Sequence, residues 1–199
     1  MTHKNSSAYT ISIMAILTAF LIIQSFIPMV GYINIIPGLP AVTTIHLTVI
    51  IGAVILGTRQ GAILGLIWGL ISLFRAYTSP GDPLSLLIFQ NPIIAILPRL
   101  MAGMIAGFTF QHLYQTKIRK TGAMALAGIF GALINTILVI GLTRVLYGHQ
   151  AAGMYHTDPT HLIIVMLGVV ALNAVMEATL AAVVTPLVAT PLMRFKRTQ

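Results

Sequence analysis

The chain has 199 residues, of which 57% are hydrophobic and only 7% are charged. Soluble globular domains carry roughly a quarter charged residues, so this composition excludes a soluble protein and indicates one integral membrane bundle. The net charge of +8 would suit nucleic-acid binding in a soluble protein. Here the basic residues stand at the ends of apolar runs, where they indicate membrane topology instead.

Six apolar runs predict an all-α integral membrane protein with a single domain over residues 1–199. In chain order, the predicted spans are about 8–30, 42–56, 62–77, 86–111, 122–147 and 161–193. The first run is too long for a signal-peptide core, and we expect it to be retained. Residues 31–41 are uncharged and rich in glycine and proline, so this loop is expected to fold back over the bundle as a lid or plug.

Small and basic residues give the packing and the orientation of these spans. Glycines recur at four-residue spacing in the third and fourth spans, which favours close helix contact: Gly61, Gly65, Gly69, Gly103 and Gly107. Six spans place both termini on one side of the membrane. That side carries most of the basic residues: Lys4, Arg59, Lys117, Arg119, Lys120, Arg194, Lys196 and Arg197. The positive-inside rule therefore predicts cytoplasmic termini.

Arg99 lies in the middle of the apolar stretch 91–107. A guanidinium in hydrocarbon costs several kcal/mol and cannot lose its proton, so it needs an anion from the protein or from a ligand. Arg99, Asn135 and Asn173 each lie about 12 residues from the outer edge of their spans, or roughly 18 Å deep. Glu177 follows Asn173 by one turn on the same helix face. Together the four side chains predict a buried site for a small polar anion.

A purely structural interpretation of the same residues stays open. An ion pair between Arg99 and Glu177 would satisfy both charges without a ligand. Asn91, Tyr77 and His46 complete the candidate substrate-binding set. His46 also fits a cap or packing group at the start of a helix, and Tyr77 also fits a core or interface residue.

Neither a metal site nor a catalytic site is expected. The chain has no cysteine, and the histidines at 149, 156 and 161 lack the spacing of a helical metal site. No nucleophile–base arrangement and no phosphate-binding glycine loop is present, so the sequence predicts no enzyme and no cofactor. ATP hydrolysis would have to take place on another polypeptide.

Several motifs together give the chain a family resemblance. They are Ala15-Ile16-Leu17-Thr18-Ala19 in the first span, His46 followed by Gly52-Ala53 and Leu56-Gly57 before the third, and Pro98-Arg99 followed by Gly103 and Gly107. The chain resembles the substrate-binding S component of energy-coupling factor (ECF) vitamin transporters over nearly its whole length. Within that family it looks most similar to the pantothenate group, with pyridoxine-type, hydroxymethylpyrimidine and folate members as rivals.

The resemblance implies a vitamin importer in the bacterial cytoplasmic membrane. It implies an outer pocket closed by the first loop, and a module of one transmembrane coupling subunit and two ATP-binding subunits as partners. It also implies that Ala15 and Ala19 dock the coupling subunit, although packing against another span of the same chain is equally compatible with the residues. Two alternatives stay open: a self-sufficient secondary carrier, proton-coupled through Glu177, and a non-transporting assembly subunit.

Overall fold

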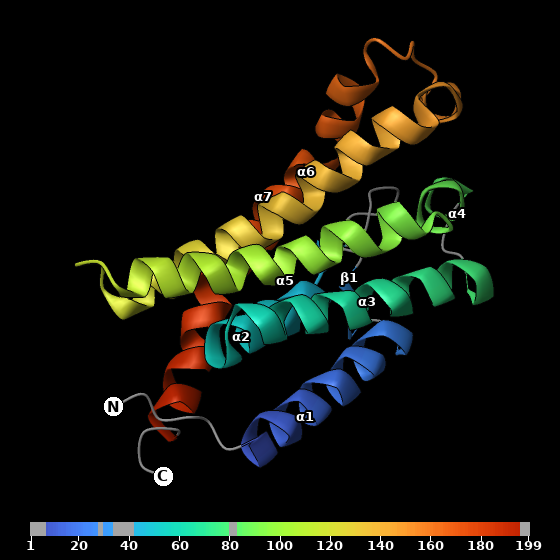
Figure 1. Ribbon diagram of the computed structural model, residues 1–199. Coiled ribbons are helices and arrows are strands. Elements are labelled where there is room, and N and C mark those ends of the chain that lie inside the picture. Colours follow the sequence, from blue (N-terminus) through green and yellow to red (C-terminus); the bar gives the residue numbers. More distant parts are fainter. Residues whose placement is uncertain (1–6, 28–29, 34–41, 80–82, 196–199) are drawn as a thin grey trace.

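The computed structural model describes residues 7–27, 30–33, 42–79 and 83–195, which form helices and one small hairpin. The helices are α1 (Ser7–Phe26), α2 (Ile45–Leu56), α3 (Thr58–Thr78), α4 (Pro83–Phe89), α5 (Pro92–Tyr114), α6 (Lys120–Met154) and α7 (Leu162–Phe195). Strands β1 (Tyr32–Ile33) and β2 (Val42–Thr43) pair antiparallel, with Tyr32 opposite Thr43. The helices form one bundle in which α6 and α7 cross α3 and α5 at an angle (Figure 1).

The all-helical membrane fold is confirmed, with five helices in the described chain that are long and apolar enough to cross a membrane. They are Ala8–Phe26, Thr58–Thr78, Pro92–Tyr114, Lys120–Met154 and Leu162–Met193. Where a second span was predicted over 42–56, the chain forms β2 and the 12-residue α2. A helix of this length reaches only about 18 Å, well short of a hydrocarbon core about 30 Å thick.

The region of the predicted fourth span is divided into two helices. The side chain of Asn91 accepts a hydrogen bond from the backbone N–H of Ile93 at 2.9 Å, and Pro92 is the first residue of α5. Asparagine at the N-cap and proline directly after it are the residues that start a helix most readily. The short helix α4 precedes this start and lies across one end of the bundle (Figure 1).

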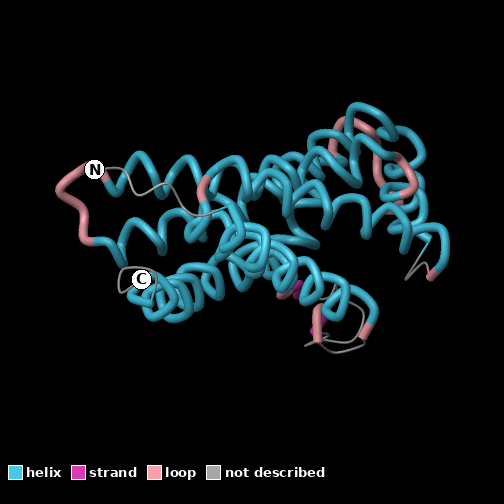
Figure 2. The backbone as a smooth tube through the Cα atoms, turned by 60° about the horizontal axis from the view of Figure 1, so that its bottom comes forward, coloured by secondary structure: helices cyan, strands magenta, loops and turns pink. Residues whose placement is uncertain are grey.

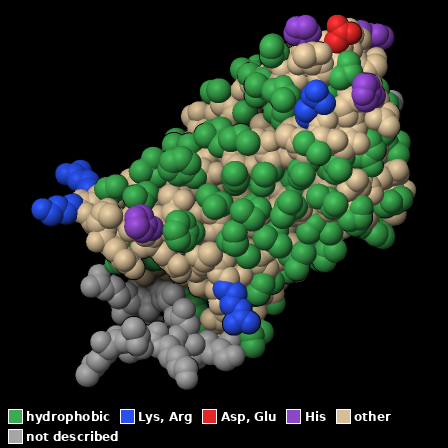
Figure 3. All heavy atoms as spheres, turned by 45° about the horizontal axis from the view of Figure 1, so that its top comes forward, with side chains coloured by type: hydrophobic (Ala, Val, Ile, Leu, Met, Phe, Trp, Pro, Cys, Tyr) green, Lys and Arg blue, Asp and Glu red, His purple; other side chains and the backbone are tan. Residues whose placement is uncertain are grey.

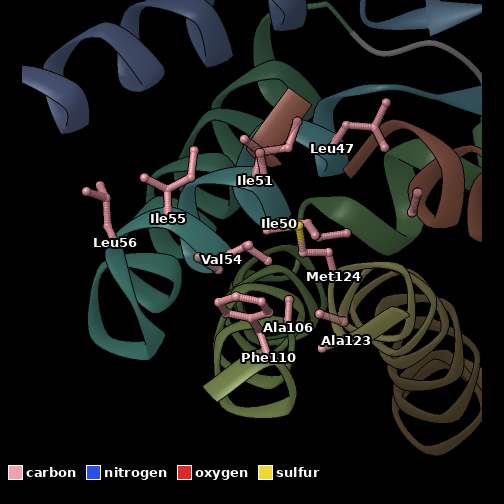
Figure 4. Close-up of a cluster of buried hydrophobic side chains, with 14 of the residues drawn as sticks. Leu47, Ile50, Ile51, Val54, Ile55, Leu56, Ala106, Phe110, Ala123 and Met124 are labelled. Carbon is pink, nitrogen blue, oxygen red and sulfur yellow. The ribbon is translucent and has the colours of Figure 1, made fainter. Parts of the chain in front are cut away.

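The core is built around α2, in which every residue is buried. Its apolar side chains pack against Ala106 and Phe110 of α5 and against Ala123 and Met124 of α6 (Figure 4). A helix that is apolar on all sides must be enclosed by protein or lipid, and here the neighbouring helices enclose it. α2 therefore serves as the central packing element of the bundle.

The predicted glycine ridge forms the closest helix contact, between α3 and α5. A Cβ atom on Gly69 would lie 2.7 Å from the Cα of Ile96, and one on Gly107 would lie 2.6 Å from the Cα of Thr58. A Cβ on Gly65 would collide with the carbonyl oxygen of Arg99. The absence of side chains along this face thus lets the backbone of α3 touch α5 at Arg99.

The ends of the bundle carry the turns and the chain termini, whereas the face between them is hydrophobic (Figure 1 and Figure 3). The start of α1, the end of α7 and the turn between α5 and α6 lie at one end, while α4 and the turn between α6 and α7 lie at the other (Figure 1 and Figure 2). Hydrophobic side chains cover the face between them, and Lys, Arg and His gather toward its edges (Figure 3). Residues 34–41, the centre of the expected lid, lie outside the described residues.

Candidate substrate-binding site

Arg99 lies inside the bundle, with only 7% of its surface exposed. Its Nη1 donates a hydrogen bond to the carbonyl oxygen of Ile94 at 2.8 Å, so the side chain runs back along α5 toward the α4 end. The guanidinium carbon lies 4.5 Å from the ring centre of Phe89 and 5.4 Å from that of Trp68. Cation–π contacts of this kind stabilise a charge without using its N–H donors.

Three polar atoms in this part of the bundle are buried and have no hydrogen-bond partner: Arg99 Nε, Trp68 Nε1 and Asn135 Oδ1. Two are donors and one is an acceptor. Buried polar atoms are almost always paired in folded proteins, so each unpaired one requires an explanation. The two unpaired donors belong to neighbouring side chains, since the guanidinium of Arg99 lies against the ring of Trp68.

The helix contacts bring the two predicted asparagines to the depth of Arg99. Gly131 of α6 packs against Ala102 of α5, and Gly128 of α6 packs against Ala181 of α7. Helices α5 and α6 run antiparallel, and so do α6 and α7. A position one turn after Gly131 in α6 therefore lies at the level of a position about one turn before Ala102 in α5. By this count Asn135 of α6 lies at the level of Arg99 in α5. Counted in the same way from Gly128 and Ala181, Asn135 also lies at the level of Asn173 in α7. Asn173 is buried and makes contacts of its own.

Glu177 is buried as well, at 8% exposure, and is held by the hairpin. Its Oε1 accepts hydrogen bonds from the backbone N–H of Thr43 at 2.8 Å and from the Thr43 hydroxyl at 2.9 Å. The ring of His46 lies beside both residues, with Nε2 3.4 Å from the Glu177 carbonyl oxygen and Nδ1 3.4 Å from Thr43 Oγ1. His46 is thus a nearly fully buried residue, the second of α2, and it lies next to the acid.

Tyr32 links the group around Arg99 to the group around Glu177. Tyr32 packs against the cluster that contains Trp68, and it is the strand partner of Thr43, which binds Glu177. The link thus runs between two buried charged side chains, Arg99 and Glu177. Among the described residues no ion pair joins them, because each uses other partners: the Ile94 carbonyl for the arginine and Thr43 for the acid.

Asn91 and Tyr77 lie at the α4 end of the bundle and outside this buried group. The Nδ2 of Asn91 donates to the hydroxyl of Tyr147 at 3.2 Å, which links the start of α5 to the kink in α6. Tyr77 is 65% exposed, and its hydroxyl donates to the carbonyl of Gln90 at 3.2 Å. Both residues therefore shape the corner between α4 and α5.

Ala15 and Ala19 are exposed on the outer face of α1. The inner face of α1 packs on the core through Ile13, Met14 and Leu17, so the two alanines do not supply its contacts within the chain. Large exposed side chains, Ile11, Ile16 and Phe20 among them, accompany the alanines on the outside of the helix. This geometry leaves the small-residue face of α1 open to lipid or to a partner.

Sequence reasoning did not single out Phe89, Thr43 or Tyr32, which the structure adds to the group. Phe89 and Tyr32 are ordinary aromatic residues in apolar surroundings, and only the fold brings them to a buried cation and a buried acid. Thr43 could have been noticed in the sequence, because it stands in the polar stretch Thr43-Thr44-Ile45-His46 at the end of the glycine- and proline-rich loop. That stretch indicated a helix cap, whereas Thr43 binds a residue of α7.

Comparison with known proteins places this chain in a family. A family model described as the substrate-specific component of ECF transporters matches residues 10–189. The pantothenate transporter PanT of Leuconostoc mesenteroides is 34% identical over 180 residues, which cover 87% of this chain and 86% of that protein. The pantothenic acid transporter PanT of Lactococcus lactis is 34% identical over 196 residues, 92% of either chain.

These matches confirm the resemblance that the motifs indicated. With its long apolar helices, the chain is a multi-pass protein of the bacterial plasma membrane. The family consists of substrate-specific transport components and not of enzymes. This chain belongs to the ECF transporter family, as its substrate-specific component.

Proposed function

We propose that this chain binds pantothenate as the substrate-binding subunit of an ECF-type importer. The observation that carries the proposal is the buried Arg99, whose Nε has no partner and whose charge no described acid pairs with. A cation left in this state is suited to an anion that arrives from outside the protein. The names of the two PanT relatives support pantothenate as that anion.

Pantothenate offers groups that match the polar atoms of the site. Its carboxylate would accept from the guanidinium of Arg99 between the rings of Phe89 and Trp68. Its amide N–H would satisfy the buried Oδ1 of Asn135, and a carbonyl or hydroxyl oxygen would satisfy the indole N–H of Trp68. Pyridoxine-type and hydroxymethylpyrimidine ligands lack a carboxylate and would leave Arg99 without a counter-ion.

The exposed alanines on α1 are proposed to dock the transmembrane coupling subunit. Small residues at 15 and 19 let a partner helix approach closely, and the structure leaves this face of α1 uncovered. ATP hydrolysis would then take place on two ATP-binding subunits that the coupling subunit connects to this chain. The chain itself would contribute binding and not catalysis.

The proposed topology has six crossings and cytoplasmic termini. The start of α1 and the end of α7 share one end of the bundle with the turn at 115–119, next to the basic residues 117, 119 and 120. The sixth crossing would be made by α2 together with the hairpin. α2 is too short to span alone, but protein surrounds it on every side, so the bilayer need not match its length.

A thermal-shift screen of the purified full chain against water-soluble vitamins tests the assignment. At a concentration 100 times its Kd, a ligand that binds only the folded chain adds about 2.7 kcal/mol to the free energy of unfolding. We expect pantothenate to raise the melting temperature, and pyridoxine, hydroxymethylpyrimidine and folate to leave it unchanged. A shift with one of those three and none with pantothenate would reassign the substrate.

A further inference from the structure

The candidate site contains a second buried charged side chain, Glu177. Because Glu177 is itself an acid, it would not bind the carboxylate of pantothenate. Within the described chain no lysine, arginine or histidine forms an ion pair with it, and its two hydrogen bonds come from the neutral groups of Thr43. Both of these bonds end on the same oxygen, Oε1. A carboxylate kept inside a membrane bundle without a cation is costly, which favours a functional role over simple packing.

The two charges lie at similar depths and come from different helices of the bundle. His46, which touches Glu177, lies eleven residues before Gly57 in α2, and Trp68, which touches Arg99, lies eleven residues after it in α3. Eleven helical residues rise by roughly 16 Å, so His46 and Trp68 lie at about the same distance from Gly57 along the bundle. Arg99 comes from α5 and Glu177 from α7, and α6 packs against both helices.

A molecule that lies between these two buried side chains meets a cation at one end and an anion at the other. With its carboxylate at Arg99, pantothenate would direct its hydroxyl end toward Glu177, where hydroxyl groups can donate to the carboxylate. A second negative charge at that end would face Glu177 across a water-poor space and be repelled. Rejection of a charged competitor by a like charge is a direct way to obtain specificity.

We propose that Glu177 is a specificity-determining residue, which admits hydrogen-bond donors at the far end of the ligand and excludes anions there. The inference rests on the proposed function, since it takes the carboxylate of the ligand to lie at Arg99. It names the substrate class more closely: monoanions that carry hydroxyl or ammonium groups at the opposite end. Dianions such as a phosphorylated form of the same molecule are excluded.

Three ligands of nearly equal size separate charge from shape. They are pantothenate itself, an analogue with the terminal CH₂OH oxidised to a carboxylate, and an analogue with that hydroxyl replaced by an ammonium group. Affinities are measured by titration calorimetry on the purified full chain. We expect the wild type to bind the ammonium analogue at least as well as pantothenate, and the dianion at least about 100-fold more weakly.

Two variants assign the discrimination to Glu177. Glu177→Gln keeps the shape and removes the charge, so the ratio between pantothenate and the dianion should fall to about tenfold or less. Thr43→Val removes one hydrogen bond to Oε1 and keeps the charge. It should weaken all three ligands by a similar factor and leave their ratios unchanged.

Three outcomes would overturn the proposal. They are equal binding of the dianion by the wild type, undiminished discrimination in Glu177→Gln, and loss of all three ligands by a folded Glu177→Gln, which would assign the acid to hairpin structure alone. Failure of pantothenate to bind the wild type would instead refute the proposed function. The two failures are therefore distinguishable.

Discussion

Thr43 donates two hydrogen bonds to one carboxylate oxygen of Glu177, at 2.8 and 2.9 Å, across a separation of 134 residues. The contact ties the hairpin to α7 directly beside the proposed pocket. Gln24 of α1 adds a second tie, because it accepts a hydrogen bond from Thr48 at 2.7 Å and donates to Thr44 at 3.5 Å. The base of the first loop is thus fixed between α1, α2 and α7.

A ligand that closes the first loop should protect its edge from chemical labelling. The chain has no cysteine, so a single Ile33→Cys substitution at the exposed end of β1 gives a unique label site. With pantothenate at ten times its Kd, we expect the labelling rate by an impermeant maleimide to fall about tenfold, because little open protein remains. Gln150→Cys, on an exposed part of α6, should label at the same rate with and without ligand. An unchanged rate at position 33 would indicate a fixed plug.

The outer face of α1 is predicted to bind the coupling subunit. Ala15→Trp or Ala19→Trp would place a large side chain where a partner helix has to approach, so uptake in cells and co-purification with the coupling subunit should be lost. Ligand affinity of the isolated chain should stay within about twofold, because both positions face away from the site. Ala171→Trp, an exposed alanine of α7, is the matched control and should support uptake. Normal uptake by both α1 variants would refute the docking face.

The contact between α3 and α5 is predicted to support the site by its closeness. In Gly65→Ala, the new Cβ meets the carbonyl oxygen of Arg99, and overpacking of this kind costs about 1–3 kcal/mol. The displaced backbone of α5 should also weaken pantothenate binding. Gly141→Ala on α6 has no atom within 4 Å of its new Cβ, and it should unfold at or above the wild-type temperature. Thermal unfolding without ligand and calorimetry with it would check both effects, and equal stability of the two variants would contradict the close contact.

Composition and spacing predict the parts of this molecule that depend on local sequence. A lone arginine in an apolar run and a row of glycines at four-residue spacing carry their physical meaning in the sequence itself. Asn91 and Pro92 are residue types typical of a helix start, but the apolar run around them suggested one continuous span. α2 shows the opposite limit, since nothing in its 12 mostly apolar residues indicates whether lipid or protein surrounds the helix.

The remaining features depend on tertiary geometry. The direction of the Arg99 side chain along α5, toward Ile94 and Phe89, follows from packing and not from the position of its Cα atom. The choice between an Arg99–Glu177 ion pair and separate partners depends on a two-residue strand, because Thr43 takes the acid. Contacts between residues more than a hundred positions apart leave no periodic pattern from which they could be predicted.

The central claim is that Arg99 binds the carboxylate of pantothenate, and calorimetric titration of wild type and Arg99→Gln with pantothenate and with its alcohol analogue pantothenol tests it most directly. The account predicts that Arg99→Gln costs about 30-fold to several thousand-fold in affinity for pantothenate, or on the order of 2–5 kcal/mol, and at most about tenfold for pantothenol. Arg99→Lys should recover only part of the loss, because an ammonium lacks the planar pair of donors. Near-native affinity for pantothenate in a folded Arg99→Gln chain, or an equal loss for both ligands, would contradict the claim.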